Sequence, residues 1–246
     1  HGALDPPTGA QGTVKEADPG SPSGTRDTPA GGAVFLAAHL ATLAAQADHT
    51  VLVSAGDLHG GSPLLSALFH EEPTVGAMNR LSLAFSAIGN HDLDKGWREL
   101  KRLQDGNCHP VDGCTGESTF PGAAYRYLAA NIVDTTTSQL MFSAYGIVAF
   151  GNVRVAFVGV ALEETPSMVL QASAEGLRFE DEVASTNAVV RALQDRGIHA
   201  IVVMLHAGGW SPGTSNACSN VSGNGIDIAQ ALSDEVDVVV TGHTHS

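Results

Sequence analysis

Runs of apolar, β-branched residues alternate along this chain with longer segments in which apolar residues recur at helical spacing. The helical spacing predicts helices over residues 33–47, 63–81 (one or two helices), 97–104, 182–196 and 226–232. The apolar runs predict strands over residues 50–55, 83–89, 128–132, 145–150, 153–160, 200–206 and 236–243. Alternating strands and helices favour an α/β fold with a mostly parallel sheet, in which the carboxyl ends of the strands lead into one group of loops.

Two segments depart from this alternation. Gly151-Asn152 separates two adjacent strand runs and predicts a hairpin. Residues 3–32 are rich in Pro, Gly, Ser, Thr and Asp and hold almost no large apolar residue. Because such a segment cannot bury much apolar surface, we predict a long flexible loop without regular structure. The 246 residues together suit one large domain, residues 1–246, with a sizeable core.

The composition restricts the classes of partner. Hydrophobic residues make up 43% of the chain and charged residues 15%, a balance typical of a globular domain. The formal net charge is −14 and no Lys/Arg cluster is present, which argues against binding to a nucleic-acid polymer. A small phosphorylated substrate is compatible with this charge, because bound divalent cations reverse the local field. No apolar run reaches the roughly 18–20 residues that a transmembrane helix requires.

The cysteines bear on the compartment. Cys108 and Cys114 lie close together in the segment N-C-H-P-V-D-G-C, and Cys218 stands apart. A disulfide between the first two would close a short loop and indicate an oxidising compartment, and two unbonded thiols are the alternative. A zinc site made from this pair and His109 is disfavoured, because no further Cys/His pair stands nearby. Cys218 is either a free thiol or paired outside this chain.

Polar residues of the kind that ligate metals follow four of the predicted strands. They are Asp57, Asn90, His206, His243 and His245, with His1 at the start of the chain. Ligand-type residues at the carboxyl ends of several buried strands suggest one composite site. All are nitrogen or oxygen donors, a set that suits divalent ions such as Mn²⁺, Zn²⁺, Fe²⁺ or Ca²⁺.

Asp57 is the only member of this set suited to bridging two ions, which lie roughly 3.5–4 Å apart in two-metal sites. Such a pair can polarise a phosphoryl oxygen and lower the pKa of a shared water, which gives hydroxide near neutral pH. Each residue also has an ordinary interpretation. Asp57 could cap a helix, Asn90 could occupy a turn, and His206 could be a hydrogen-bonded histidine at a strand end.

His91 and Asp94 lie in the segment I-G-N-H-D-L-D-K-G of residues 88–96. A carboxylate three residues after a histidine, at a strand-to-loop junction, can bond one ring nitrogen and support the imidazolium form. Beside the ions, that imidazolium would stabilise transition-state charge and protonate a leaving alkoxide, a contribution of about 10²–10⁴-fold. These two residues are the predicted catalytic pair, and Asp92 is assigned no chemical role.

The other polar candidates are assigned no ligand role. His59 is expected to support the Asp57 loop indirectly or to be exposed, and Asn131 is expected to cap a turn. Five histidines have no motif around them and are interpreted as surface or packing residues: His39, His49, His70, His109 and His199.

Four segments in a fixed order carry a family resemblance. They are G-D-L-H-G-G-S at 56–62, G-N-H-D-L-D-K-G at 89–96, L-H-A-G-G at 205–209 and G-H-T-H at 242–245. Together they resemble the calcineurin-like metallophosphoesterases, in particular the catalytic domain of the 5′-nucleotidase branch, and the resemblance covers the whole chain. It implies a metallophosphatase-type α/β fold, in which a β-sandwich of mixed sheets is flanked by helices.

The resemblance also implies two metal sites that share one carboxylate. The implied ligands are, for one ion, a family aspartate with His1, Asp57 and His245, and, for the other, Asp57, Asn90, His206 and His243. The opening His1-Gly2 resembles the second half of the family's first motif, Asp-x-His-Gly. The chain is therefore expected to be a fragment without the first strand and its aspartate. The separate C-terminal domain that holds the nucleoside in this branch is likewise expected outside the chain.

The function implied by the resemblance is phosphate release from nucleoside 5′-monophosphates or related nucleotides, by in-line attack of a metal-bound hydroxide. The expected location is extracytoplasmic: secreted, periplasmic or at the cell surface. A cyclic-nucleotide phosphodiesterase or a UDP-sugar hydrolase would use the same centre. A metal-binding but non-catalytic surface module is the alternative of a different class.

Overall fold

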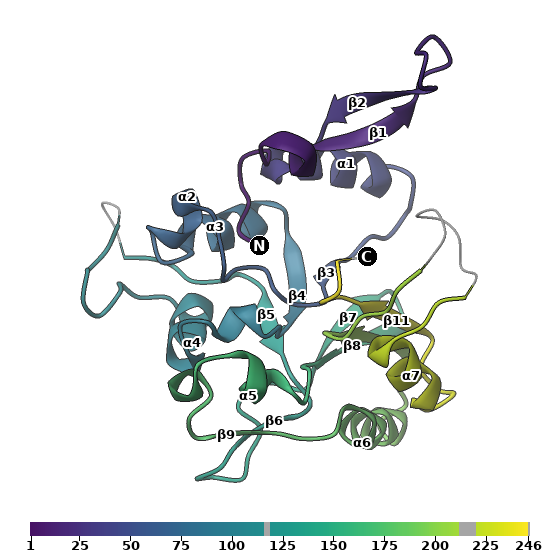
Figure 1. The fold of residues 1–246 in the computed structure, drawn as a ribbon. Helices are drawn as coiled ribbons and strands as arrows, with labels where there is room; N and C mark the ends of the chain where they lie inside the picture. The colour runs from purple at the N-terminus through teal and green to yellow at the C-terminus, as the bar shows by residue number, and fades with distance from the viewer. Residues whose placement is uncertain (116–118, 212–219, 246) are drawn as a thin grey trace.

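Two packed sheets form the centre of the computed structural model, which describes residues 1–115, 119–211 and 220–245 (Figure 1). The first sheet is parallel, in the order β3 (Leu52–Ser54), β4 (Leu83–Ala87) and β5 (Arg126–Leu128). The second has the order β11 (Val238–Thr241), β10 (Ala200–Leu205), β8 (Val153–Val160) and β7 (Tyr145–Phe150). In the second sheet only β7 runs antiparallel, because Gly151-Asn152 turns it directly into β8.

The two sheets face each other across an apolar layer. Strand β4 contacts β8 and β10, and β5 contacts β7 and β8. The buried residues of this layer are Phe85, Ala87, Leu128, Phe157 and Met204. Strands covered on both faces have no polar face, which is why they appear in the sequence as continuous apolar runs.

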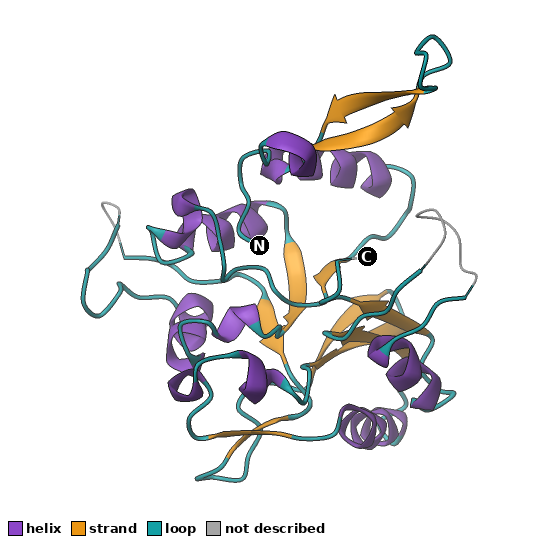
Figure 2. Ribbon diagram, in the orientation of Figure 1, coloured by secondary structure: helices purple, strands orange, loops and turns teal. Residues whose placement is uncertain are grey.

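Helices cover the outer faces of both sheets (Figure 2). Helices α3 (Glu72–Arg80) and α4 (Trp97–Asp105) pack on the first sheet, and α6 (Glu182–Gln194) and α7 (Asn224–Ala231) pack on the second. Helix α6 begins where the Asp181 carboxylate accepts the Ala184 N–H at 2.6 Å. The result is the predicted β-sandwich flanked by helices, in which one sheet is parallel and the other is mixed.

Short elements complete the body. They are α2 (Leu64–Ala67), α5 (Thr165–Met168), and the antiparallel pair β6 (Ile132–Asp134) and β9 (Leu177–Phe179), with 3₁₀ turns at Gly9–Gly12, His91–Leu93 and Gln171–Ser173. Cys108 and Cys114 form a disulfide, one of the two alternatives left open by the sequence. Cys218 lies outside the described residues. None of the described helices is both long enough and apolar enough to cross a membrane.

The prediction of an irregular loop over residues 3–32 is wrong. Strand β1 (Thr13–Ala17) pairs antiparallel with β2 (Thr25–Pro29), and the hairpin projects from the body beside α1 (Gly32–Ala44), as Figure 1 shows. Glu16 lies opposite Arg26 and pairs with it at 2.9 Å, and it also accepts a hydrogen bond from Thr28. The hairpin buries little apolar surface, and polar cross-strand pairs and β-branched residues stabilise it instead.

Candidate active site

Most of the predicted site residues lie just after strands of the two central sheets. Asp57 follows β3, Asn90 and His91 follow β4, His206 follows β10, and His243 follows β11. Parallel strands place such loops at the same edge of a sheet. Contacts between residues of the two sheets, described below, show that both edges meet at one cluster.

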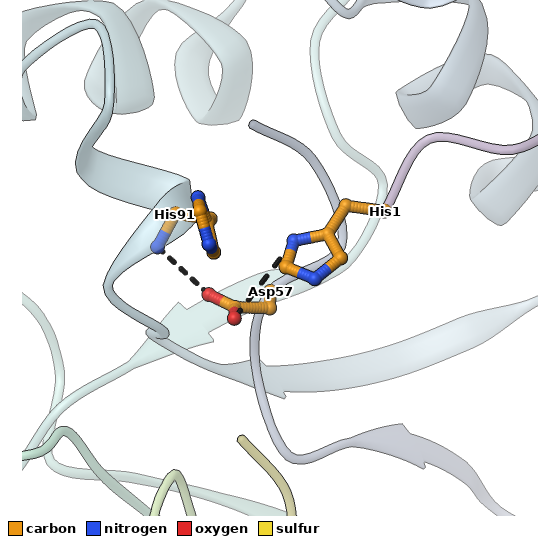
Figure 3. A group of neighbouring side chains, drawn as sticks. All are labelled: His1, Asp57 and His91. Atoms are coloured by element: carbon orange, nitrogen blue, oxygen red, sulfur yellow. Dashed lines mark hydrogen bonds and ion pairs between the residues drawn. The ribbon is translucent and has the colours of Figure 1, made fainter. Parts of the chain in front are cut away.

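The Asp57 carboxylate is the centre of this cluster (Figure 3). Its Oδ1 accepts a hydrogen bond from the His91 backbone N–H at 2.8 Å. Its Oδ2 lies 3.2 Å from His206 Nε2 and 3.8 Å from His1 Nδ1. Burial disfavours the charged carboxylate, but the hydrogen bond and charge of His206 outweigh burial and hold the pKa of Asp57 below its usual value.

His206 joins the second sheet to Asp57 from a fully buried position. Its Nδ1 donates to the Ala55 carbonyl at 2.7 Å, so Nε2 is the nitrogen directed at Asp57 and at Asn90 Oδ1, 3.2 Å away. A carbonyl that accepts a hydrogen bond from one ring nitrogen of a histidine fixes which nitrogen is left to bind a metal ion. Burial lowers the pKa of His206, but the hydrogen bond and charge of Asp57 outweigh burial and raise it overall.

The remaining predicted ligands surround Asp57. His1 Nε2 lies 3.2 Å from His245 Nε2, and the centroid of the His1 ring lies 4.5 Å from that of His91. The His243 ring packs edge-on to His206 at 5.1 Å, and burial lowers the pKa of His243. His243 and His245 have φ values of 74° and 56°, and such left-handed backbone in non-glycine residues is found at functional sites.

Two overlapping groups of side chains have ligand atoms within 4.8 Å of one another. One contains His1, Asp57 and His91, and the other contains Asp57, His206 and His243. Asp57 is common to both groups, as expected of a bridging carboxylate. The first group contains His91, whereas the family resemblance implied His245. The His245 side chain contacts His1, a member of this group.

The His91–Asp94 pair is formed as the sequence suggested. The 3₁₀ turn that starts at His91 places residues three apart on the same face, and His91 Nδ1 lies 3.0 Å from Asp94 Oδ2. Their side chains are 42% and 31% exposed, so the pair is open to a substrate. Both residues line a cavity of about 680 Å³, while His1, Asp57 and Trp210 line another of about 610 Å³.

Asp92 has a positioning role that the sequence did not reveal. Its side chain is fully buried and accepts hydrogen bonds from the backbone N–H groups of Asp57 (2.9 Å), Gly89 (2.9 Å) and His59 (3.3 Å). Burial raises the pKa of Asp92, and its attraction to His59 opposes that rise. This carboxylate therefore ties the Asp57 loop to the loop after β4. Its one detectable signal was that it is a second acid, beside Asp94, within residues 88–96.

Replacement of Asp92 by alanine should lower the free energy of unfolding by about 3–4 kcal/mol, because three buried N–H groups lose their acceptor. Urea unfolding of the purified variant measures this loss. Asp234→Ala, at an exposed position, is the matched control and should change stability by less than about 0.5 kcal/mol. A loss below about 1 kcal/mol for Asp92→Ala would show that water replaces the carboxylate.

The structure decides the roles of the other polar candidates. His59 is 3% exposed, and its Nε2 lies 3.0 Å from the Tyr127 hydroxyl, so of its two expected roles the structure shows support of the Asp57 loop and not exposure. Asn131 is fully buried and bonds both the N–H and the carbonyl of Ala161, so it joins neighbouring chain segments and does not cap a turn. His70 and His109, expected to be surface or packing residues, stack on each other.

Comparison with known families agrees with this arrangement. Residues 18–246 match the model of the family described as calcineurin-like phosphoesterase. The chain belongs to this family. The family prediction made from the four segments is therefore confirmed, together with the α/β fold class.

The chain spans less than a third of the length of the two curated relatives described next. It is 31% identical over 223 residues to the endonuclease YhcR of Bacillus subtilis, a match that covers 91% of the chain and 18% of that protein. It is 27% identical over 219 residues to the NAD 5′-nucleotidase of Haemophilus influenzae, covering 87% of the chain and 31% of the relative. The solved NAD nucleotidase of Haemophilus influenzae has the same fold, with a TM-score of 0.73 at 22% identity over 100% of this chain and 37% of that one.

Proposed function

We propose that this chain is the catalytic domain of a metal-dependent phosphoester hydrolase that releases phosphate from nucleoside 5′-monophosphates or related nucleotides. The observation that carries the proposal is the position of Asp57 in both groups of ligand-type side chains. A carboxylate shared by two such groups suits a pair of divalent ions that lie close together.

The donors fit such a pair. Asp57, Asn90, His206 and His243 would hold one ion, and Asp57, His1 and His245 would hold the other, together with the aspartate implied by the family motif. All are nitrogen or oxygen donors, which suit Mn²⁺, Zn²⁺, Fe²⁺ or Ca²⁺. When bound, the ions polarise the phosphoryl oxygens and lower the pKa of a coordinated water.

His91 and Asp94 supply the proton chemistry. Asp94 bonds Nδ1 of His91, so Nε2 is free to carry a proton to the leaving oxygen of the substrate. The imidazolium form also places positive charge next to the phosphate as negative charge develops on it. Asp94 stabilises that form and fixes the ring orientation.

Charge and the relatives support the proposed substrate class. A chain with a net charge of −14 favours a small anionic substrate drawn in by bound cations over a long polyanion. The Haemophilus relative is named as a nucleotidase, which favours nucleotides. The Bacillus relative is named as an endonuclease, so a phosphodiester substrate is the second candidate. We propose that a domain that holds the nucleoside lies outside the segment that these relatives share with this chain.

The disulfide favours an extracytoplasmic location. Cys108 and Cys114 are paired across a six-residue separation, and such bonds persist in oxidising compartments. We therefore propose that the protein acts at the cell surface, in the periplasm or outside the cell, where it would act on extracellular nucleotides.

Removal of metal ions tests the proposal in the full-length protein. Treatment with EDTA followed by gel filtration should abolish hydrolysis, and Mn²⁺, Zn²⁺ or Ca²⁺ should restore it. Phosphate release is then measured on 5′-AMP, 3′,5′-cyclic AMP, UDP-glucose, p-nitrophenyl phosphate and single-stranded DNA. The nucleoside monophosphate should give the highest kcat/KM.

The outcomes separate the candidates. Preference for cyclic AMP or UDP-glucose would replace the nucleotidase by a phosphodiesterase or nucleotide-sugar hydrolase with the same centre. Cleavage of DNA as the best substrate would favour the endonuclease. Binding of two ions per chain without hydrolysis of any substrate would indicate a non-catalytic metal-binding module.

A further inference from the structure

A separate cluster of ligand-type side chains lies where three distant segments meet. His70 lies between α2 and α3, Glu99 lies in α4, and His109 lies in the loop closed by the Cys108–Cys114 disulfide. One ligand atom from each of these three residues lies within 4.8 Å of the other two. None of them belongs to the groups around Asp57.

The two histidines are held in a fixed arrangement. Their rings stack at 3.7 Å between centroids with an interplanar angle of 3°. The side chains of His70, His109 and Glu99 are 23%, 19% and 15% exposed, so all three are partly buried and yet accessible to an ion. Ordered and partly buried donors lose little conformational freedom when they bind a ligand.

Asp112 faces both rings with one carboxylate oxygen. Its Oδ2 lies 3.0 Å from His70 Nε2 and 3.4 Å from His109 Nδ1. The Asp112 backbone N–H also reaches His109 Nδ1 at 3.2 Å. A histidine that ligates a metal commonly bonds a carboxylate through its other nitrogen, and here one carboxylate serves two rings. In His70 this leaves Nδ1 for an ion. In His109 the same holds for Nε2 in the tautomer that carries its proton on Nδ1, which donates to the Asp112 carboxylate in place of accepting the backbone N–H.

The surrounding charges also favour a cation. Arg102 holds Glu99 through two hydrogen bonds of 2.9 and 2.7 Å and is shared with Glu72 at 2.8 Å. Each carboxylate oxygen has two lone pairs, so Glu99 can accept the hydrogen bonds from Arg102 and still coordinate a metal ion. Among the groups in direct contact, the three carboxylates of Glu72, Glu99 and Asp112 outnumber the one guanidinium of Arg102, while Lys95 and Arg98 line the same cavity.

We propose that His70, Glu99 and His109 form an additional divalent-cation site, suited to Zn²⁺, in which Asp112 is a positioning residue. Two histidines and a carboxylate are a common zinc ligand set, with a fourth position open to water. Ligand atoms around tetrahedral zinc lie about 3.3 Å apart, so small side-chain movements would close the site. An ion there would clamp the disulfide loop to α4 and to the α2–α3 connection. The three ligands line the same cavity as His91.

Zinc content measures the proposal directly. The full-length protein and the variant His70→Ala/His109→Ala are saturated with Zn²⁺, freed of excess metal by gel filtration and analysed by mass spectrometry for ions per chain. The double variant should hold one ion fewer than the unmodified protein. His199→Ala, at an exposed histidine, is the control and should hold the same number. The difference does not depend on how many ions the Asp57 centre binds, so failure of the proposed function would not affect it.

A conservative variant tests whether the loss of zinc in the double variant is caused by misfolding. Asp112→Asn keeps all three ligands and should weaken zinc binding at this site by 10–100-fold, measured by competition with a chromogenic chelator. Excess Zn²⁺ should also raise the Tm of the unmodified protein by more than it raises that of the double variant. Equal zinc content and equal Tm shifts in the two proteins would overturn the proposal. Unchanged affinity in Asp112→Asn would remove the role of Asp112.

Discussion

Replacement of Asp57 by asparagine should lower kcat/KM for phosphoester hydrolysis by at least about 10³-fold, which corresponds to about 4 kcal/mol of lost transition-state stabilisation. Asparagine has nearly the same shape but carries no charge. It cannot balance two cations, and it removes the carboxylate that belongs to both ligand groups. His206 would also lose its charged partner at 3.2 Å. The measurements are steady-state kinetics on 5′-AMP and ions bound per chain.

Asp234→Asn is the matched control for this substitution, because it makes the same chemical change at an exposed position. It should leave both kinetics and metal content unchanged. Circular dichroism of Asp57→Asn should match that of the unmodified protein, since asparagine keeps the shape of the side chain and Asp57 lies outside the apolar clusters. Full activity of Asp57→Asn with unchanged metal content would refute the proposed centre.

Replacement of His91 by alanine should lower kcat for 5′-AMP by about 10²–10⁴-fold while metal content stays the same. The reason is that His91 is proposed to supply a proton to the leaving oxygen. Asp94→Asn should produce part of this loss, because Asp94 only orients and stabilises the imidazolium through the 3.0 Å contact. Kinetics and metal analysis of both variants test the assignment.

The choice of substrate sharpens this test. A nucleoside leaving group needs a proton, whereas p-nitrophenolate leaves readily without one, so His91→Ala should harm hydrolysis of p-nitrophenyl phosphate much less. His39→Ala, at an exposed histidine, serves as the control. His91 also falls within 4.8 Å of His1 and Asp57 ligand atoms, so it has an alternative role as a ligand. Loss of one ion per chain in His91→Ala would establish that role and refute the proton donor.

Much of the fold could be predicted from the sequence, because its signals are local. Strands buried on both faces appear as continuous apolar runs, and amphipathic helices appear as apolar residues at helical spacing. The two strands of the β7–β8 hairpin were predicted from their apolar runs, and its turn was predicted from Gly151-Asn152, where Gly151 adopts a φ of 60°. The positions of the four ligand-bearing segments could also be predicted, because each segment directly follows a predicted strand.

The β1–β2 hairpin could not be predicted from composition. Its stability comes from pairs such as Glu16 with Arg26, which lie ten residues apart and face each other only in one register. Composition does not encode register. A polar segment that pairs with itself therefore looks the same, by composition alone, as one that stays irregular.

The sequence by itself determined the family, the alternation of strands and helices, and which residues can act as ligands, because motif order and apolar periodicity are properties of short segments. Only the tertiary structure decided which of these residues meet. It placed Asp57 between two ligand groups, buried Asp92 beneath three backbone N–H groups, and stacked His70 on His109. Such contacts depend on the packing of segments far apart in the sequence, such as Ala55 with His206 and His1 with His245, and no local pattern records that packing.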